Sequence, residues 1–189
     1  MKLGDGVEQA IHSVTMLSCL QPGSTLSAAA LAEFHGVSTS YLLKHLQAMS
    51  GAGLLEAVSG PKGGYRLARA PEKITLLDIV LAVEGPEPAF RCNEIRLRGP
   101  NPYTCKPAAP CTINVAMLRA EQAYRAELRR VTVAGIIADL KTIDGDGAIA
   151  ARTNGFLIAD LKTIDGDGAI AARTNGFLAL HERKSGTAA

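Results

Sequence analysis

Apolar residues recur at helical spacing through residues 7–131, and a glycine-rich stretch interrupts them once. Residues 7–20 place their apolar side chains on one face of a predicted first helix. Residues 28–34 are rich in alanine and leucine, which favour helix. Gly36 follows them and can adopt the left-handed conformation that commonly ends a helix. The pattern therefore predicts two helices before residue 37.

A third helical stretch begins at Ser38, whose hydroxyl is predicted to cap it, and turns Leu42, Leu46 and Met49 toward the core. A helix that follows a short turn in this way is typical of helix-turn-helix proteins, in which its first residues meet base edges and phosphates. The predicted DNA contacts of this recognition helix are Ser38, Thr39, Ser40, Tyr41, Lys44 and His45.

A hairpin is predicted next, with strands at residues 54–58 and 65–67. The turn between them reads Gly-Pro-Lys-Gly-Gly, and glycine permits positive φ and close approach of the backbone to a phosphate. Lysine and arginine in the hairpin would add charge-assisted phosphate contacts. The predicted contacts of this wing are Ser59, Lys62, Gly63, Gly64 and Arg66. The alternative is a small packed domain that touches no DNA.

The helices and the hairpin together predict a mainly helical fold with a small β-wing, a winged helix-turn-helix, over residues 1–84. Thr75 and Asp78 form a predicted capping box for a closing helix at 76–83. Residues 85–110 hold prolines at positions 86, 88, 100, 102, 107 and 110, so this segment is predicted to be a loop without regular structure.

One narrow apolar stripe runs along residues 111–136, among many arginines and glutamates. Such a stripe on a long charged helix is typical of a dimer seam, so we expect a dimerisation helix and a homodimer. The alternative is a helix that packs back on its own domain. The stripe consists of Ile113, Met117, Ala120, Tyr124, Leu128 and Val131.

The 21 residues 137–157 are repeated without change at 158–178, and residues 179–189 complete the chain. Two copies are too few for a solenoid, so this tail is assigned no chemistry. An Asp-Gly-Asp-Gly run in each copy resembles part of a calcium loop. Ala148 and Gly155 occupy the fifth and twelfth loop positions, where oxygen ligands are needed, so an EF-hand is excluded.

Composition and charge argue against several classes of function: general nucleic-acid coating, membrane insertion, secretion and catalysis. The net charge of +2 is too small for general coating of nucleic acid. The chain has no apolar run long enough to span a membrane and no signal-peptide pattern, so we expect a cytoplasmic protein. The histidines lie away from the cysteines in sequence and form no acid–base constellation, so an enzyme is not expected.

Candidate chemistry lies in Cys92, Cys105 and Cys111, spaced C-x12-C-x5-C on the proline-rich loop. Three thiols before a dimer helix can hold a metal or an iron–sulfur cluster as thiolates. The spacing matches neither a zinc ribbon nor a ferredoxin. Free cysteines, or a pair that oxidises reversibly to a disulfide, are the alternative.

Several segments together resemble the Rrf2 family of bacterial winged-helix regulators. They are MKLGDGVEQAIHSV, STSYLLKHL, SGPKGGYRLAR, ITLLDIVLAVEG and the three-cysteine loop. The resemblance covers residues 1–135, and its GGYRLA wing motif is specific. It implies a homodimer, a double-stranded DNA operator and, in many members, an iron–sulfur cluster beside the long helix.

Within the family, the chain most resembles RsrR-like redox sensors. Their [2Fe-2S] cluster is bound by a glutamate and a histidine of one subunit and two loop cysteines of the other. The matching residues are Glu8, His12, Cys92 and Cys105, with Cys111 as an alternative ligand. Glu8 and His12 are four residues apart and share one helix face. Because the gap between the first two cysteines differs from that in relatives, a [4Fe-4S] cluster on three cysteines and Glu8 stays open.

The resemblance implies an iron–sulfur-dependent transcriptional regulator, a repressor that responds to redox state or nitric oxide. A cluster-free thiol/disulfide regulator is the main alternative, and an adaptor that has lost DNA contact is another. Ser59 stands where many members have an arginine that reads the minor groove in some relatives. We therefore expect an operator preference different from theirs.

Overall fold

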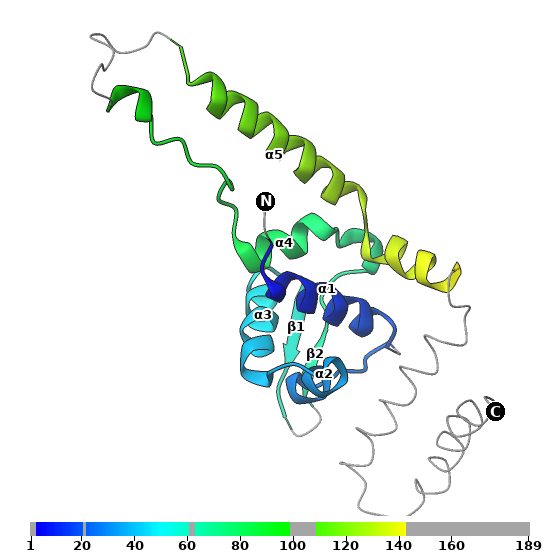
Figure 1. Ribbon diagram of the computed structural model, residues 1–189. Helices are drawn as coiled ribbons and strands as arrows, with labels where there is room; N and C mark the ends of the chain where they lie inside the picture. The colour runs from blue at the N-terminus through cyan, green and yellow to red at the C-terminus, as the bar shows by residue number, and fades with distance from the viewer. Residues whose placement is uncertain (1–2, 21, 61–62, 99–108, 143–189) are drawn as a thin grey trace, which may run out of the picture.

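The structure is a computed structural model that describes residues 3–20, 22–60, 63–98 and 109–142. Figure 1 shows a helical body with a hairpin on one side and one long helix that leaves the body. The elements in chain order are α1 (Asp5–Ser18), α2 (Ala28–His35), α3 (Thr39–Gly51), β1 (Leu55–Val58), β2 (Gly64–Leu67), η1 (Pro71–Lys73), α4 (Leu76–Glu84), η2 (Ile95–Leu97) and α5 (Thr112–Arg130), followed by helical residues 133–142. The predicted fold class, mainly helical with a two-strand wing, is confirmed.

The core lies where α1, α3 and α4 pack on one another, while α2 and the hairpin close its sides. Helical spacing correctly predicted the buried face of α3, because Leu42, Leu46 and Met49 have no exposed surface. Val14 of α1 and Ile79 of α4 meet them in the same cluster. The recognition helix is therefore held by its apolar face, and its opposite face is left to solvent.

Local signals explain where most helices begin and end. Gly36 adopts φ 64° and ψ 34° and ends α2, as predicted. Thr75 and Asp78 form the predicted capping box: the Asp78 carboxylate accepts the Thr75 backbone N–H at 2.9 Å. The predicted cap at Ser38 is wrong. Its hydroxyl lies 3.0 Å from that of Ser40 and forms no bond to the backbone of α3.

The wing is an antiparallel hairpin in which Leu55 pairs with Leu67. On its outer edge, Leu26 pairs with Tyr65 through two backbone bonds of 3.1 and 2.8 Å. Gly64 is needed here, because a Cβ at this position would lie 2.4 Å from the Leu26 carbonyl oxygen. The chain before α2 thus covers the hairpin edge and fixes its orientation.

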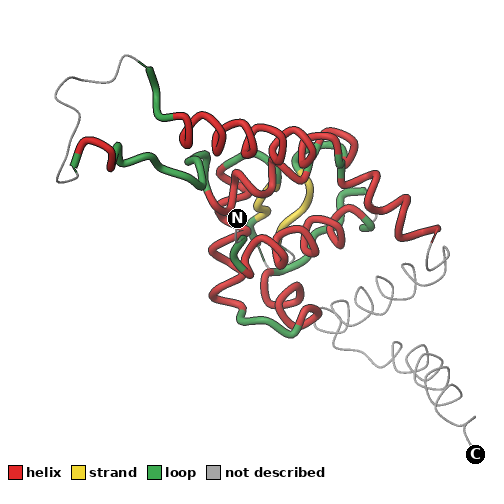
Figure 2. The backbone as a smooth tube through the Cα atoms, turned by 45° about the horizontal axis from the view of Figure 1, so that its top comes forward, coloured by secondary structure: helices red, strands yellow, loops and turns green. Residues whose placement is uncertain are grey.

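Helix α5 packs on α4, and Tyr124 and Arg125 of its C-terminal half lie beside Leu77 and Leu81. Thr132 pairs with Thr75, and Val133 is fully buried in the core. The N-terminal half of α5 and the loop beside it project beyond the winged domain in two views (Figures 1 and 2). There the apolar stripe is open to solvent, with Ile113 64% and Met117 43% exposed.

The loop that leads to α5 is described except for residues 99–108. Its described part contains the short 3-10 helix η2, so the prediction that prolines exclude all regular structure there is wrong. The prolines of this described part lie at positions 86, 88 and 110, outside η2, which explains how the turn forms. None of the described helices is long and apolar enough to cross a membrane.

Candidate nucleic-acid interface and cysteine sites

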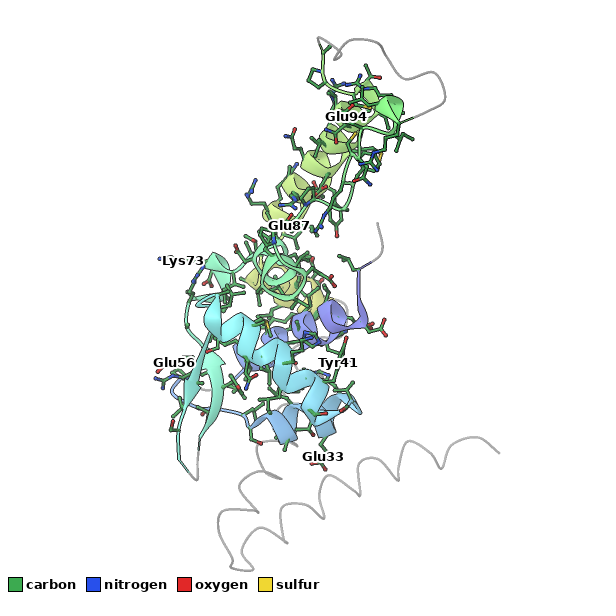
Figure 3. The ribbon with its side chains drawn as sticks, turned by 90° about the vertical axis from the view of Figure 1, so that its left-hand side faces the viewer. Glu33, Tyr41, Glu56, Lys73, Glu87 and Glu94 are labelled. Carbon is green, nitrogen blue, oxygen red and sulfur yellow. The ribbon has the colours of Figure 1, made fainter. Side chains whose placement is uncertain are left out.

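The first turns of α3 present a polar surface. Each side chain predicted there as a DNA contact is exposed, apart from one. Tyr41 is 44% exposed, and Figure 3 shows it at the edge of α3 that faces away from the wing. The exposed residues are Ser38, Thr39, Ser40, Tyr41 and Lys44.

His45 is the exception, since its side chain is only 7% exposed and lies in the interior. Its position, three residues after Leu42 and four before Met49, places it on the buried face of the helix. Burial, and then the charge of Lys44, lower the pKa of His45, and Glu84 opposes them. The ring is therefore in the wrong place for the predicted contact with DNA.

The wing carries less free charge than its sequence suggests. Arg66 donates from Nε and Nη2 to the two carboxylate oxygens of Glu56, its partner across the hairpin, both at 2.9 Å. The hydrogen bond from Arg66 lowers the pKa of Glu56, so the pair is ionised. Ser59 is exposed, and Lys62 lies outside the described residues. A phosphate contact by Arg66 would have to compete with Glu56.

The wing glycines approach their own chain. A Cβ at Gly63 would lie 2.2 Å from the carbonyl oxygen of Val58 and 2.8 Å from that of Gly60. Crowding by the hairpin itself at Gly63, and by the chain before α2 at Gly64, is therefore sufficient to require glycine at both positions, without any phosphate.

Cys92 and Cys111 are brought together at the far end of the loop. Cys111 precedes α5, and the backbone N–H of Asn114 is the main cause that lowers the pKa of its thiol. The Ile113 N–H, a hydrogen bond with Cys92 and the charge of Arg96 lower this pKa further, while burial opposes them. Both thiols line a recess of about 520 Å³. This pair has the electropositive surroundings of a reactive thiol or a thiolate ligand.

Glu8 and His12 lie on the exposed face of α1, one turn apart. They line a recess of about 290 Å³ together with His35, whose ring centroid lies 5.8 Å from that of His12. Burial, and then the charge of His12, lower the pKa of His35. Sequence reasoning missed His35, the last residue of α2, which the connection between α1 and α2 brings back against α1.

The two pairs of candidate ligands stay apart within one chain. The described residues contain no group of three or more histidine, cysteine or acidic side chains that could hold a metal. Glu8 with His12 is one pair, and Cys92 with Cys111 is the other. Cys105, predicted as the second thiolate, lies outside the described residues.

An ion pair between a buried glutamate and a half-buried arginine fixes the root of the cysteine loop to α5. Glu121 is 9% exposed, accepts the Ala89 backbone N–H at 3.0 Å and pairs with Arg125 at 2.7 Å. Arg125 also donates to the carbonyl oxygen of Pro86 at 2.8 Å. We call Glu121 and Arg125 the loop latch. Figure 3 places Glu87 near this root and Glu94 at the far end of the loop.

Comparisons with known proteins agree with this architecture. A family model, Rrf2, described as an iron-dependent transcriptional regulator, matches residues 3–139. YwgB of Bacillus subtilis strain 168, named as an HTH-type transcriptional regulator, is 40% identical over 85 residues, 45% of this chain and 54% of YwgB. YffB of Lactococcus lactis strain IL1403, named likewise, is 31% identical over 136 residues, 72% of this chain and 86% of YffB.

The fold is also similar to that of a solved structure. CymR, described as the global cysteine regulator of B. subtilis, superposes with a TM-score of 0.58 and 20% identity. The match covers 73% of this chain and 97% of CymR. At this identity the likeness concerns the fold alone, which is mainly helical with a two-strand wing.

Proposed function

Because the chain belongs to the Rrf2 family of DNA-binding transcriptional regulators, we propose that it is a repressor whose operator binding depends on an iron–sulfur cluster. Membership of this family makes it a regulator and not an enzyme. What we propose beyond family membership is the iron–sulfur cluster, its response to redox state or nitric oxide, and the homodimer.

The proposed DNA surface is the exposed start of α3 together with the wing tip. Ser38, Thr39, Ser40, Tyr41 and Lys44 supply hydroxyl and ammonium groups that suit base edges and phosphates. Ser59 of the wing, which is exposed, and Lys62, which lies outside the described residues, complete the proposed contacts, whereas His45 is buried in the interior. Two copies joined through α5 would present two such surfaces to a roughly palindromic operator.

The proposed sensing site is shared between two subunits. Glu8 and His12 of one chain and Cys92 and Cys105 of the other would hold a [2Fe-2S] cluster, as in RsrR-like relatives. The observation that supports this proposal is that Glu8 with His12 and Cys92 with Cys111 form two accessible pairs on separate elements, and neither pair supplies enough ligands alone. Cys105, the proposed second thiolate, lies outside the described residues.

The chemistry of the donors fits the group. Carboxylate, imidazole and thiolate are all iron ligands in proteins, and the amides at the start of α5 favour a thiolate at Cys111. When bound, the cluster supplies a one-electron redox centre. Cys111, which lies beside Cys92, is the alternative to Cys105 as the second thiolate. A [4Fe-4S] cluster held by three cysteines and Glu8 is the alternative to the [2Fe-2S] cluster.

The experiment is anaerobic purification followed by absorption spectroscopy and iron analysis. We expect a coloured, iron-containing protein, and loss of the chromophore in both Glu8→Ala and Cys92→Ala. Cys19→Ser is the matched control, because Cys19 is half-buried at the end of α1 and belongs to neither pair. A wild-type protein that stays colourless after reconstitution contradicts the proposal.

A second candidate is a cluster-free thiol switch, which the hydrogen bond between Cys92 and Cys111 favours. Peroxide would oxidise the Cys111 thiolate to a sulfenic acid and release hydroxide. The Cys92 thiol would then form the disulfide and release water. Free-thiol counting on iron-free protein, before and after peroxide, should show a loss of two thiols per chain. An unchanged count excludes this candidate.

A further inference from the structure

We infer that His45 is a positioning residue through which α1, the helix that carries Glu8 and His12, sets the placement of the recognition helix α3. This inference rests on the proposed function, since it gives that sensing site a route to the DNA surface. It is carried by the packing around the His45 ring.

The first turn of α1 lies directly against this ring. Gly6 is buried, and a Cβ at its position would lie 2.4 Å from both Cε1 and Nε2 of His45. No real Cβ tolerates such a distance, so the ring fills the space that a side chain would need. Gly6 is two residues before Glu8 in the same helix. A movement of α1 that displaces Glu8 therefore also displaces Gly6 and its contact with the His45 ring.

The other side of the ring reaches the DNA surface. Tyr41 and His45 are one turn apart on α3, and their rings meet edge to face with centroids 4.6 Å apart and an interplanar angle of 82°. Tyr41 is partly exposed at the proposed contact surface. The His45 ring therefore lies between α1 and a side chain that faces DNA.

Two features make this contact able to transmit a displacement. The Gly4 backbone N–H donates to the Glu84 carboxylate at 3.0 Å, which holds the start of α1 beside the end of α4. The buried Nε2 of His45 has no hydrogen-bond partner among the described residues, so this nitrogen does not anchor the ring, which packs against Gly6 and Tyr41. A close-packed contact of this kind shifts when its neighbour shifts, because it has no free volume to absorb the movement.

The first test uses the full-length, iron-free protein and amide hydrogen exchange of α3. Gly6→Ala places a methyl group in the space that the His45 ring occupies. Relative to the wild type, we therefore expect amide exchange to accelerate more in the first turns of α3 than in α2. Gly51→Ala is the matched control, because Gly51 ends α3 and has open space around its Cβ position. Equal exchange in Gly6→Ala and Gly51→Ala overturns the inference.

A double variant separates direct contact from general loss of stability. In the His45→Ala background the methyl of Gly6→Ala meets no ring, so its effect on α3 exchange should disappear. Additive effects would show that Gly6 acts on α3 by another route. If His45→Ala does not fold, the comparison of Gly6→Ala with Gly51→Ala still decides.

The second test measures coupling in the cluster-loaded protein. The ratio of operator affinities between the two cluster redox states is determined on a duplex selected by the wild-type protein. Allosteric couplings commonly give ratios of about 5 to 150. We expect His45→Ala to bring this ratio close to one with unchanged absorption and iron content.

An equal loss of affinity in both redox states would mean that His45 is merely structural, and overturns the inference. A wild-type ratio of one, or a wild-type protein without iron, instead contradicts the proposed function. In that case the hydrogen-exchange experiment on the iron-free protein still tests the contact between Gly6 and His45.

Discussion

Arg66 illustrates how one neighbouring side chain can alter the role of a basic residue. In sequence it is a wing arginine, whereas in the structure Glu56 accepts hydrogen bonds from two of its three guanidinium nitrogens, Nε and Nη2. Both side chains are substantially exposed, so the pair adds little stability. Its main consequence is electrostatic: Glu56 cancels a charge that would otherwise attract phosphate.

Removing the Glu56 charge should therefore strengthen DNA binding. For Glu56→Gln we expect a several-fold higher affinity for duplex DNA, and a plot of log K against log salt that is steeper by about 0.9, the value for one added phosphate contact. Fluorescence anisotropy over a potassium chloride series measures both. Glu127→Gln removes the same charge from α5 as a control. Parallel salt slopes for the two variants would show that Arg66 does not reach a phosphate.

His35 should make stability depend on pH. Its pKa is below the ordinary value of 6.5, because burial and His12 disfavour the charged form. The unfolded chain therefore takes up the proton first, and the free energy of unfolding falls as pH decreases below about 6.5 toward the lower folded pKa. Urea denaturation at pH 7.5, 6.5 and 5.5 measures this, in a range above the titration of most carboxylates. His35→Gln should show a shallower fall, and the same fall as the wild type would contradict the assignment.

Single residues also mark where sequence reasoning succeeds and fails. The buried face of α3 was predictable from Leu42, Leu46 and Met49, and the same spacing places His45 on that face. We expected His45 at the DNA surface because histidine is polar, although its neutral imidazole can be buried. The partner of Arg66 was not predictable, because it depends on the register of the hairpin, which the turn sets in three dimensions.

At the scale of elements, the loop latch determines how the cysteine loop leaves the domain. Glu121 and Arg125 are separated by one helical turn and look in sequence like a solvent-exposed pair. The loop covers them, so backbone groups of residues 86–89 become their partners. A pattern within one helix cannot reveal such partners, since they come from a segment more than thirty residues away.

Removing the latch should free the root of the loop. For Glu121→Ala we expect amide exchange at Ala89 to accelerate about ten-fold or more, because a hydrogen bond to a buried charged group is lost. Hydrogen exchange with mass spectrometry over residues 86–91 gives the readout. Glu127→Ala is the control, since Glu127 is exposed and its pairing with Arg130 is long, at 3.9 Å. Similar protection in both variants would show that other contacts hold the loop.

The helices themselves were largely predictable, because caps and apolar spacing are local. The predicted first helix at 7–20 and the observed α1 differ by two residues at each end, and the capping box of α4 is confirmed. The predicted Ser38 cap of α3 is wrong, because the Ser38 hydroxyl pairs with the Ser40 hydroxyl instead. The long helix was predicted from its stripe, but the division of that stripe between α4 and solvent follows from packing that no local signal encodes.

At the scale of the whole molecule, α5 has two different halves. Tyr124 and Leu128 are half-buried where the helix meets the body, whereas Ile113 and Met117 of the same stripe are open to solvent. Packing on its own domain thus describes the C-terminal half of the stripe, whereas pairing with a second copy stays a prediction for the exposed half. The exposed half is the surface that the proposed homodimer would cover.

A charge on that surface should separate the proposed dimer. Met117→Glu places an unpaired carboxylate in the apolar seam, twice per symmetric pair, so we expect at least a hundredfold weaker self-association. Sedimentation velocity across a concentration series measures this. Ala126→Glu is the matched control, because nine residues at 100° each place it on the opposite face of α5. Equal dissociation constants for the two variants would contradict pairing through the stripe.

Val133 bears on the order in which the chain folds during synthesis. It completes the core of the winged domain, and Thr132 pairs with Thr75, yet both residues follow α5 in the chain. A nascent chain that has emerged only as far as Arg130 has made its recognition helix and its long helix without the residue that closes the core. During translation, the apolar stripe of α5 therefore leaves the ribosome before Thr132 and Val133, the residues that complete the core of the winged domain.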